Sequence, residues 1–336
     1  MLHTPEIKAQ LAAQKAQCLF CKLIAKEIES KIVFEDDAAI AVLDINPALK
    51  GHTLFLLKEH YPIMPYIPPD EFRHYFGLIP KLSRAVKEGI VRTGMSLFIA
   101  NGGIAGQQSS HFLIHLLPRE NGDGFFNFLF SGGREELTGE GKKVLVRNFP
   151  LVMENHFRRI PAVWHRGKGN IPPFLEKIYE SSPLLYEDER VLVVLAKRGM
   201  VPGHVEIYSK TEVKLIENLS EEEVVHLFYT ASCAASLLFE GLKAQGTNII
   251  LKSGRSDDNP EGGLVVHVLP RKEGDGLPDL CWKPRSADYD LDSVASKIKD
   301  RTWKINYQEE KKKVVVETKS VSNDDEIGKA IVRIKK

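Results

Sequence analysis

The sequence predicts an α+β protein built from two tandem units, each an antiparallel sheet with helices, related by a pseudo-twofold axis. An internal repeat is the first observation: Tyr186 aligns with Phe34 at an offset of 152 residues, and the same offset places His204 on His52 without a gap. The second is the order within each unit, where short β-branched runs flank one helical stretch. The third is length, because 336 residues correspond to about two domains of roughly 150 residues.

The predicted strands of the first unit begin with KIVFED, AIAVLD and TLFLLK, and those of the second include VLVVLA, HVEIYS, TNIILK and GLVVHVLP. In the first unit the segment after Pro69 has apolar residues at helical spacing and predicts one amphipathic helix through Val86. Its counterpart in the second unit begins at Ser220, a favourable N-cap residue.

We expect five parts along the chain: an N-terminal helical arm (1–16), a first unit (17–140), a helix and basic linker (141–170), a second unit (171–301) and a strand-like basic tail (302–336). The arm lacks the apolar core of a signal peptide, and no apolar run reaches 18 residues. Lys plus Arg number 46 against 45 Asp plus Glu, so overall charge favours neither nucleic acid nor membrane. We expect a cytoplasmic protein.

Four cysteines occur, and Cys18 and Cys21 form a C-x-x-C pair. That pair alone is compatible with a redox site, a zinc site or coincidence. The same unit contains His60 and His111, which could complete a tetrahedral Cys2His2 set. The offset of 152 places these four positions on Asn170, Pro173, Glu212 and Gly263. All four candidate ligands are therefore absent together from the second unit, as expected if they serve one ion.

The segments GHTLFLLKEH and AGQQSSHFLIHLLPR, with a closing GDG, resemble the histidine triad (HIT) superfamily of nucleotidyl hydrolases and transferases, whose signature is His-φ-His-φ-His-φ-φ. The resemblance covers residues 18–125 and, more weakly, 171–285, and extends distantly to galactose-1-phosphate uridylyltransferases. The resemblance to zinc-bearing members of the superfamily implies that Cys18, Cys21, His60 and His111 are the zinc ligands of this chain. Four protein ligands leave no open position, so such a zinc is structural.

The triad departs from the family pattern at its middle position. Family enzymes use the middle His as the nucleophile that takes the α-phosphate, and the equivalent residues here are Leu113 and Val265. Neither side chain can attack phosphorus, so catalysis by the family mechanism is expected to be lost. The first unit keeps His111 and His115, whereas the second keeps only His267.

His52 and His204 follow a glycine in both units and resemble the family's additional His behind the triad. They persist where the nucleophile does not. We therefore expect them to have a structural rather than a catalytic role.

The resemblance also implies a nucleotide site in the first unit. An Asp holds the ribose, and an Asn, a Gly-Gln pair and the triad lie near the phosphate; the matching residues are Asp44, Asn101, Gly106, Gln107, His111 and His115. The alternative is that Asp44 and Asn101 serve only their turns. In the second unit Asp44 becomes Ala196 and Asn101 becomes Ser253, so binding there is expected to be weaker.

Three functions follow as hypotheses. The first is a catalytically impaired nucleotide-binding or scaffold protein with a structural zinc in the first unit. The second is a nucleotidyl hydrolase or transferase with residual activity on purine nucleotides, through His111, His115 or a metal-activated water. The third is an RNA- or ribonucleoprotein-binding, or other protein-binding, role for residues 155–170 and the C-terminal tail, where basic and aromatic residues interleave. We expect no membrane partner.

Overall fold

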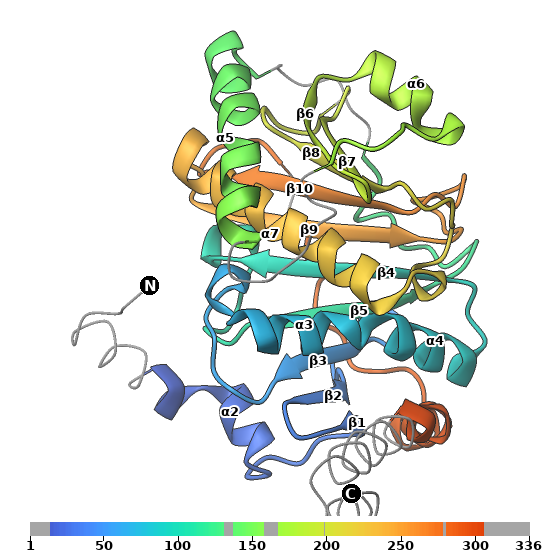
Figure 1. The fold of residues 1–336 in the computed structure, drawn as a ribbon. Helices are drawn as coiled ribbons and strands as arrows, with labels where there is room; N and C mark the ends of the chain where they lie inside the picture. The colour runs from blue at the N-terminus through green and yellow to red at the C-terminus, as the bar shows by residue number, and fades with distance from the viewer. Residues whose placement is uncertain (1–13, 131–136, 158–166, 198, 278–279, 306–336) are drawn as a thin grey trace, which may run out of the picture.

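Both repeats build one ten-stranded antiparallel sheet (Figure 1). The computed structural model describes residues 14–130, 137–157, 167–197, 199–277 and 280–305. The first repeat supplies β1 (Ile32–Glu35), β2 (Ala39–Leu43), β3 (Thr53–Leu57), β4 (Gly94–Asn101) and β5 (Leu113–Arg119). The second supplies β6 (Leu184–Glu187), β7 (Val191–Leu195), β8 (Val205–Ser209), β9 (Gly246–Ser253) and β10 (Val265–Arg271).

The strand order is symmetric about the boundary between the repeats: β1-β2-β3-β5-β4-β9-β10-β8-β7-β6. At the centre, β4 pairs with β9 so that Phe98 lies opposite Ile250. These two residues are equivalent at the offset of 152, so a pseudo-twofold axis passes between them. The predicted architecture of two α+β units is confirmed, and the central strand pair joins their sheets into one.

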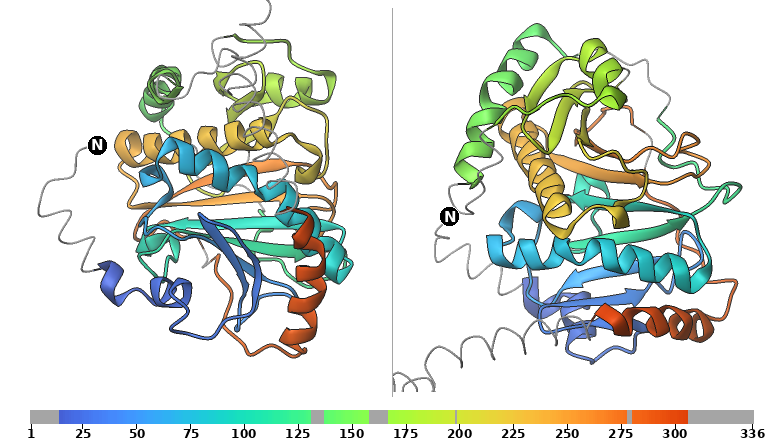
Figure 2. Two further views of the ribbon diagram at one scale, coloured as in Figure 1. Left: turned by 60° about the horizontal axis from the view of Figure 1, so that its bottom comes forward. Right: turned by 45° about the vertical axis from the view of Figure 1, so that its right-hand side comes forward.

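Helices cover one face of the sheet (Figures 1 and 2): α3 (Pro69–Gly77), α4 (Ile79–Ile90), α7 (Glu221–Leu242) and, beside α7, α5 (Gly139–Phe157). The N-cap predicted at Ser220 is confirmed as a full capping box with Glu223. The single helix predicted after Pro69 is wrong, because the chain is interrupted at Leu78. Pro80 lacks the N–H that would continue the helical hydrogen bonds there.

The main core lies between the sheet and these helices. Aromatic rings of the two repeats stack across it: Phe72 and Tyr229 have centroids 4.0 Å apart, and Phe76 and Phe228 lie 4.7 Å apart. The helix α7 is long and apolar enough to resemble a membrane span, but 78% of that window is buried inside the protein. We therefore assign α7 to the core.

The opposite face is covered in three places. The helix α2 (Leu19–Ile24) packs over β2 and β3, and α6 (Pro173–Ser181) packs over β7. Between them, Phe128 and Leu280 belong to a small cluster with Phe98 and Ile250 at the centre of the sheet. Loop segments rather than helices thus cover the sheet around the pseudo-twofold axis.

The C-terminal part of the described chain packs on the first repeat. Residues 291–305 form a helix, and Ile298 approaches Gly89 so closely that a Cβ at Gly89 would lie 2.9 Å from its Cα. Thr302 Oγ1 donates a hydrogen bond to the carbonyl of Val33. The strand-like tail predicted from residue 302 is therefore wrong for 302–305, which continue this helix. Residues 306–336, residues 1–13 of the arm and 158–166 of the linker lie outside the described residues.

Candidate functional site

The four predicted metal ligands come together beside α2. Cys18 precedes this helix and Cys21 lies within it. His60 follows β3 and His111 precedes β5, and these two strands are paired, so the two histidines are brought to the same end of the sheet. One donor atom from each of the four residues lies within 4.8 Å of the others.

The distances fit a tetrahedral ion. Cys21 Sγ lies 3.3 Å from His60 Nδ1 and 3.5 Å from His111 Nδ1, and Cys18 Sγ lies 3.7 Å from His111 Nδ1. Sulfur and nitrogen ligands of a tetrahedral zinc are separated by about 3.6 Å, given bonds of about 2.3 and 2.05 Å. His111 Nε2 lies 2.8 Å from the carbonyl of Leu57, to which it donates, so its Nδ1 lone pair faces the thiols.

Burial favours the neutral forms of His60, His111 and Cys21. It lowers the pKa of His111 to about 4 and lowers that of His60, and together with the neighbouring Cys18 it raises the pKa of Cys21 to about 12. Within the described chain, His60 Nε2 is buried without a hydrogen-bond partner, while its Nδ1 faces a thiol. A bound divalent cation would suit this cluster, since it takes neutral imidazole as a ligand and stabilises thiolate.

A cavity of about 350 Å³ lies next to this cluster. Much of its lining is apolar, and α2 contributes Leu19, Phe20 and Leu23 to it. The loop between β4 and β5 also lines it, where residues 106–109 contribute glycine, two glutamines and a serine. Asp44 also lines the cavity, at the end of β2. An apolar surface with a few placed polar groups is typical of a small-molecule site.

Most of the predicted nucleotide-binding residues line this cavity: Asp44, Gly106, Gln107, His111 and His115. Asn101 does not. Its Oδ1 accepts from the Met64 N–H at 3.1 Å and its Nδ2 donates to Thr247 Oγ1 at 3.2 Å. Both ends of its amide thus hold β4 against its neighbours, and the predicted contact of Asn101 with a phosphate stays a prediction.

Gln107 lines the cavity, but its amide is also occupied. The side-chain oxygen accepts from Gly102 N at 2.7 Å, and Nε2 donates to the carbonyl of Pro62 at 2.6 Å. Gln107 therefore shapes the loop and leaves the loop backbone to face a ligand.

A histidine relay, formed by the hydrogen-bonded pair His52 and His115, lies beside the cavity, and His115 lines it. The Ala48 N–H donates to His52 Nδ1 at 3.3 Å, and His52 Nε2 lies 3.0 Å from His115 Nδ1. Because His52 accepts at Nδ1, its proton is on Nε2 and is donated to His115, whose own proton is then on Nε2. Burial lowers the pKa of both histidines to about 3, so both are neutral.

The second repeat keeps this relay. Met200 N donates to His204 Nδ1 at 3.2 Å, and His204 Nε2 lies 3.0 Å from His267 Nδ1. Ala196 stands where the first repeat has Asp44, so the relay does not depend on a carboxylate at that position. His204, Glu206 and His267 lie close enough together to form a candidate metal-binding set. However, His204 accepts a hydrogen bond at Nδ1 and carries its proton on Nε2, so neither of its ring nitrogens has a free lone pair for a metal.

Side chains occupy the part of the second repeat's counterpart cavity next to His267, whereas a cavity of about 290 Å³ remains beside Ala196 and His204. Lys252 replaces Ala100, which lines the first repeat's cavity. Its Nζ donates to the carbonyls of Phe128 and Asp258 at 2.5 and 3.2 Å and lies 4.1 Å from the Phe130 ring centroid. Phe130 in turn packs on His267 with centroids 4.8 Å apart. Burial lowers the pKa of Lys252 to about 8.

The second repeat also contributes residues to the first repeat's cavity, which the sequence analysis missed. Cys281 and Trp282 line it, and the Trp282 ring lies 5.0 Å from His52 and 5.1 Å from His115, edge-on to both. The sequence feature that could have indicated this contribution is the offset of 152, which aligns Trp282 with Phe130. Each repeat thus places an aromatic ring over the relay of the other.

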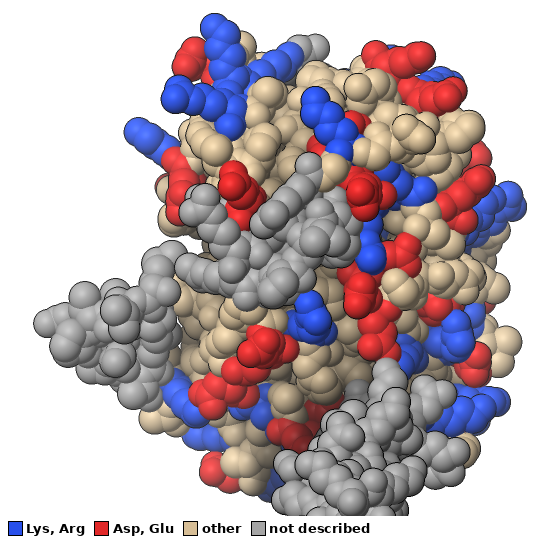
Figure 3. Space-filling view, in the orientation of Figure 1, with Lys and Arg blue, Asp and Glu red and all other residues tan. Residues whose placement is uncertain are grey.

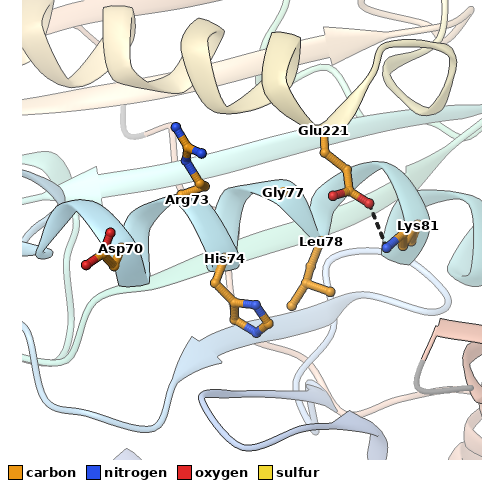
Figure 4. Close-up of a pocket in the computed structure, with 7 residues that line it drawn as sticks. All are labelled: Asp70, Arg73, His74, Gly77, Leu78, Lys81 and Glu221. Atoms are coloured by element: carbon orange, nitrogen blue, oxygen red, sulfur yellow. Dashed lines mark ion pairs between the residues drawn. The ribbon is translucent and has the colours of Figure 1, made fainter. Parts of the chain in front are cut away.

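A second concavity, of about 380 Å³, lies on the helical face between α3, α4 and the start of α7 (Figure 4). Its lining mixes charges: Lys81 pairs with Glu221 at 2.7 Å, and Asp70 and Arg73 lie nearby. His74 is held by Asp36 at 2.7 Å. Figure 3 shows both signs of charge interspersed over this side of the molecule. This concavity therefore favours no one class of ligand charge.

The family model for the HIT domain matches residues 25–122 and 179–274, one match in each repeat. The chain belongs to the HIT family. An uncharacterized HIT-like protein of Methanocaldococcus jannaschii is 40% identical over 107 residues, which are 32% of this chain and 82% of that protein. Adenylylsulfatase HINT3 of Arabidopsis thaliana is 33% identical over 116 residues, 34% of this chain and 59% of HINT3.

One solved structure resembles the whole two-repeat arrangement of this HIT protein. An ADP-glucose phosphorylase from Arabidopsis thaliana with bound ADP-glucose aligns over 84% of this chain and 89% of its own, with a TM-score of 0.53 and 13% identity. At that identity the similarity shows a shared fold and nothing more.

The buried histidines predict acid sensitivity. Unfolded His has a pKa of about 6.5, whereas burial holds the pKa of His52, His115 and His204 at about 3. Below about pH 6.5 the unfolded chain binds protons that the folded chain does not, so the free energy of unfolding falls as the pH drops toward 3. Above about pH 6.5 these groups leave stability unchanged.

Urea denaturation from pH 8 to 4.5, with a chelator present to exclude metal release, measures this dependence. We expect a shallower fall for His204→Gln, which removes one such group. Equal stability at pH 6.5 and 4.5 for the natural protein would contradict the prediction.

Proposed function

We propose that the first repeat binds a purine nucleotide in the 350 Å³ cavity without cleaving it through a histidine intermediate, and that Cys18, Cys21, His60 and His111 hold a structural zinc beside it. One observation carries this proposal: an apolar wall, a carboxylate and a histidine donor line a single cavity in which Leu113 occupies the nucleophile position.

Each part of a nucleotide has a matching surface. The side chains of Leu19, Phe20 and Leu23 offer an apolar face for the base. Asp44 supplies a carboxylate that can accept hydrogen bonds from both ribose hydroxyls. The loop over residues 106–109 and the Nε2–H of His115 supply donors for the phosphate. The name adenylylsulfatase, carried by the relative HINT3, favours an adenine nucleotide.

Neither of the two histidines that line the cavity, His111 and His115, is placed to replace the missing nucleophile. Both ring nitrogens of His111 are engaged, Nε2 with the carbonyl of Leu57 and Nδ1 with the two thiols. The proton of His115 lies on Nε2, because its Nδ1 accepts from His52. A protonated nitrogen donates a hydrogen bond and cannot attack phosphorus.

Zinc is the metal that this donor set fits. Two thiols and two imidazoles suit a tetrahedral site, and the hydrogen bond from His111 Nε2 to the carbonyl of Leu57 orients the His111 ring so that Nδ1 can bind the metal. With four protein ligands the ion would supply structural cross-linking. Metal analysis of the purified protein should give one zinc per chain, and Cys21→Ser should lower that content.

Binding is tested by calorimetric titration with AMP and GMP, with product analysis of the same samples. We expect saturable binding without turnover, whereas rapid product formation would favour the residual-hydrolase hypothesis. Absence of binding at millimolar nucleotide would contradict the proposal.

Ala100→Lys should abolish binding, because it transfers to the first repeat the side chain that fills the second. We expect affinity to fall by at least about 100-fold, as a ligand would have to displace the lysine chain and its buried charge. The matched control is Val91→Lys, which adds the same charge at a position that is 83% exposed and away from the cavity lining. Equal affinities of the two variants would contradict the assignment of this cavity.

A further inference from the structure

We propose that the metal site is the latch of the ligand cavity: Cys18 and Cys21 position α2, which contributes part of the cavity's apolar lining, so that metal occupancy sets ligand affinity. This proposal rests on the proposed function for its ligand, but its first prediction concerns the protein alone.

This part of the lining is a weak structural element by itself. The helix α2 has six residues, no buried residue and no side-chain hydrogen bond at its N-cap, Cys18. Isolated helices of this length are unstable in water. Yet Leu19, Phe20 and Leu23 of this helix line the cavity.

Few other contacts hold α2 in place. Phe20 and Leu23 are only partly buried where they pack on the small cluster over β2 and β3. The ion pairs Lys15–Glu59 and Lys26–Glu35 flank the helix, but three of these four side chains are about half exposed or more. Exposed pairs of this kind contribute little to stability. The two thiols that face His60 and His111 are thus the strongest available anchor once a metal bridges them.

His111 couples the anchor to the cavity directly. Its ring belongs to the metal-binding set, lines the cavity and lies edge-on to Phe20, with centroids 6.1 Å apart. The carbonyl of Leu57 fixes this ring from the β3 side. A change in metal occupancy therefore acts on two cavity-lining elements together.

The rest of the fold does not need this anchor. The main core joins the sheet to α3, α4 and α7, and none of the four ligands belongs to it. Loss of the metal is therefore expected to loosen residues 14–30 and to leave the central strands β4 and β9 intact.

Hydrogen exchange with mass spectrometry tests the latch on the full-length protein, zinc-loaded and stripped by a chelator. We expect exchange in peptides from residues 14–30 to accelerate at least about tenfold on stripping, with no change in β4 and β9. Cys21→Ser should behave like stripped protein even with zinc present. Cys233→Ala, a buried cysteine of α7 outside the metal site, is the matched control and should keep the zinc-dependent protection.

The linkage to ligand is measured by titrating AMP into both forms. We expect stripping to weaken AMP binding by about 10- to 100-fold, and AMP to tighten zinc binding by the same factor, because coupling between two sites is reciprocal. Equal AMP affinity in the two forms would overturn the coupling.

The exchange data decide the latch independently of the nucleotide. Unchanged exchange in residues 14–30 would overturn it, and so would acceleration spread over the whole sheet, which would make the metal a support of the entire fold. If zinc-loaded protein bound neither AMP nor GMP, the proposed function would fail, and the exchange result alone would then confirm or reject the latch.

Discussion

Leu113→His is expected to create a nucleotidyl hydrolase activity, because it returns an imidazole to the position of the family's nucleophile. The residue lines the cavity on β5, between His111 and His115, where the family's nucleophile stands. The relay already leaves a proton on His115 Nε2, so a neighbouring imidazole would meet a preformed donor. Loss of a nucleophile costs about 10⁴ to 10⁶ in rate, and its return to an intact site should raise the rate by at least about 10³.

A nucleoside phosphoramidate with a fluorescent amine leaving group measures this rate, and mass spectrometry of quenched protein detects a nucleotidylated histidine. The matched control is Val265→His, the same change in the second repeat, which should remain inactive because Lys252 and Phe130 fill that site. A silent Leu113→His variant that still binds AMP would show that the cavity holds its ligand away from this position. Activity in Val265→His would contradict the assignment of a filled second site.

The offset of 152 residues predicted most of the architecture, because a repeat that packs on itself about a twofold axis constrains strand order. The metal-binding set was also predictable, since Cys18, Cys21, His60 and His111 vanish together from the second repeat. Local rules were enough for the cap at Ser220. The same local rules failed at Pro80. Its missing N–H interrupts the helix, although the apolar spacing that predicted one long helix continues past it.

The cavity itself was only partly predictable. Asn101 has the residue type of a phosphate contact, but pairing of β4 with β9 gives its amide other partners. Trp282 and Cys281 enter the first repeat's cavity from the second, a tertiary arrangement that no local pattern encodes. Filling of the second site depends likewise on Phe130 crossing between repeats to cover Lys252. A sequence gives the type of each residue, but which hydrogen-bond or packing partner a side chain takes depends on the tertiary structure.

Arg119→Ala is expected to cause a large loss of stability. The guanidinium is fully buried and bonds to Asp123, Ser96, the carbonyl of Phe125 and Asp258 of the second repeat. Its removal deprives two carboxylates, Asp123 and Asp258, of their guanidinium partner, and their side chains are 4% and 0% exposed. Uncompensated buried charge of this kind costs about 3–5 kcal/mol.

The equivalent arginine of the second repeat provides the matched control for this prediction. Arg271 bonds to Asp275, whose side chain is 12% exposed, and to Asn248, and neither contact crosses to the first repeat. Arg271→Ala should therefore cost less, about 1.5–3 kcal/mol, because only one partly solvated carboxylate loses its partner. Urea denaturation at pH 7.5 measures both variants. Arg119 links the two repeats through Asp258. Equal losses of unfolding free energy in the two variants would mean that this link adds no stability. A larger loss for Arg271→Ala would mean that Arg271, not Arg119, is the more important of the two arginines.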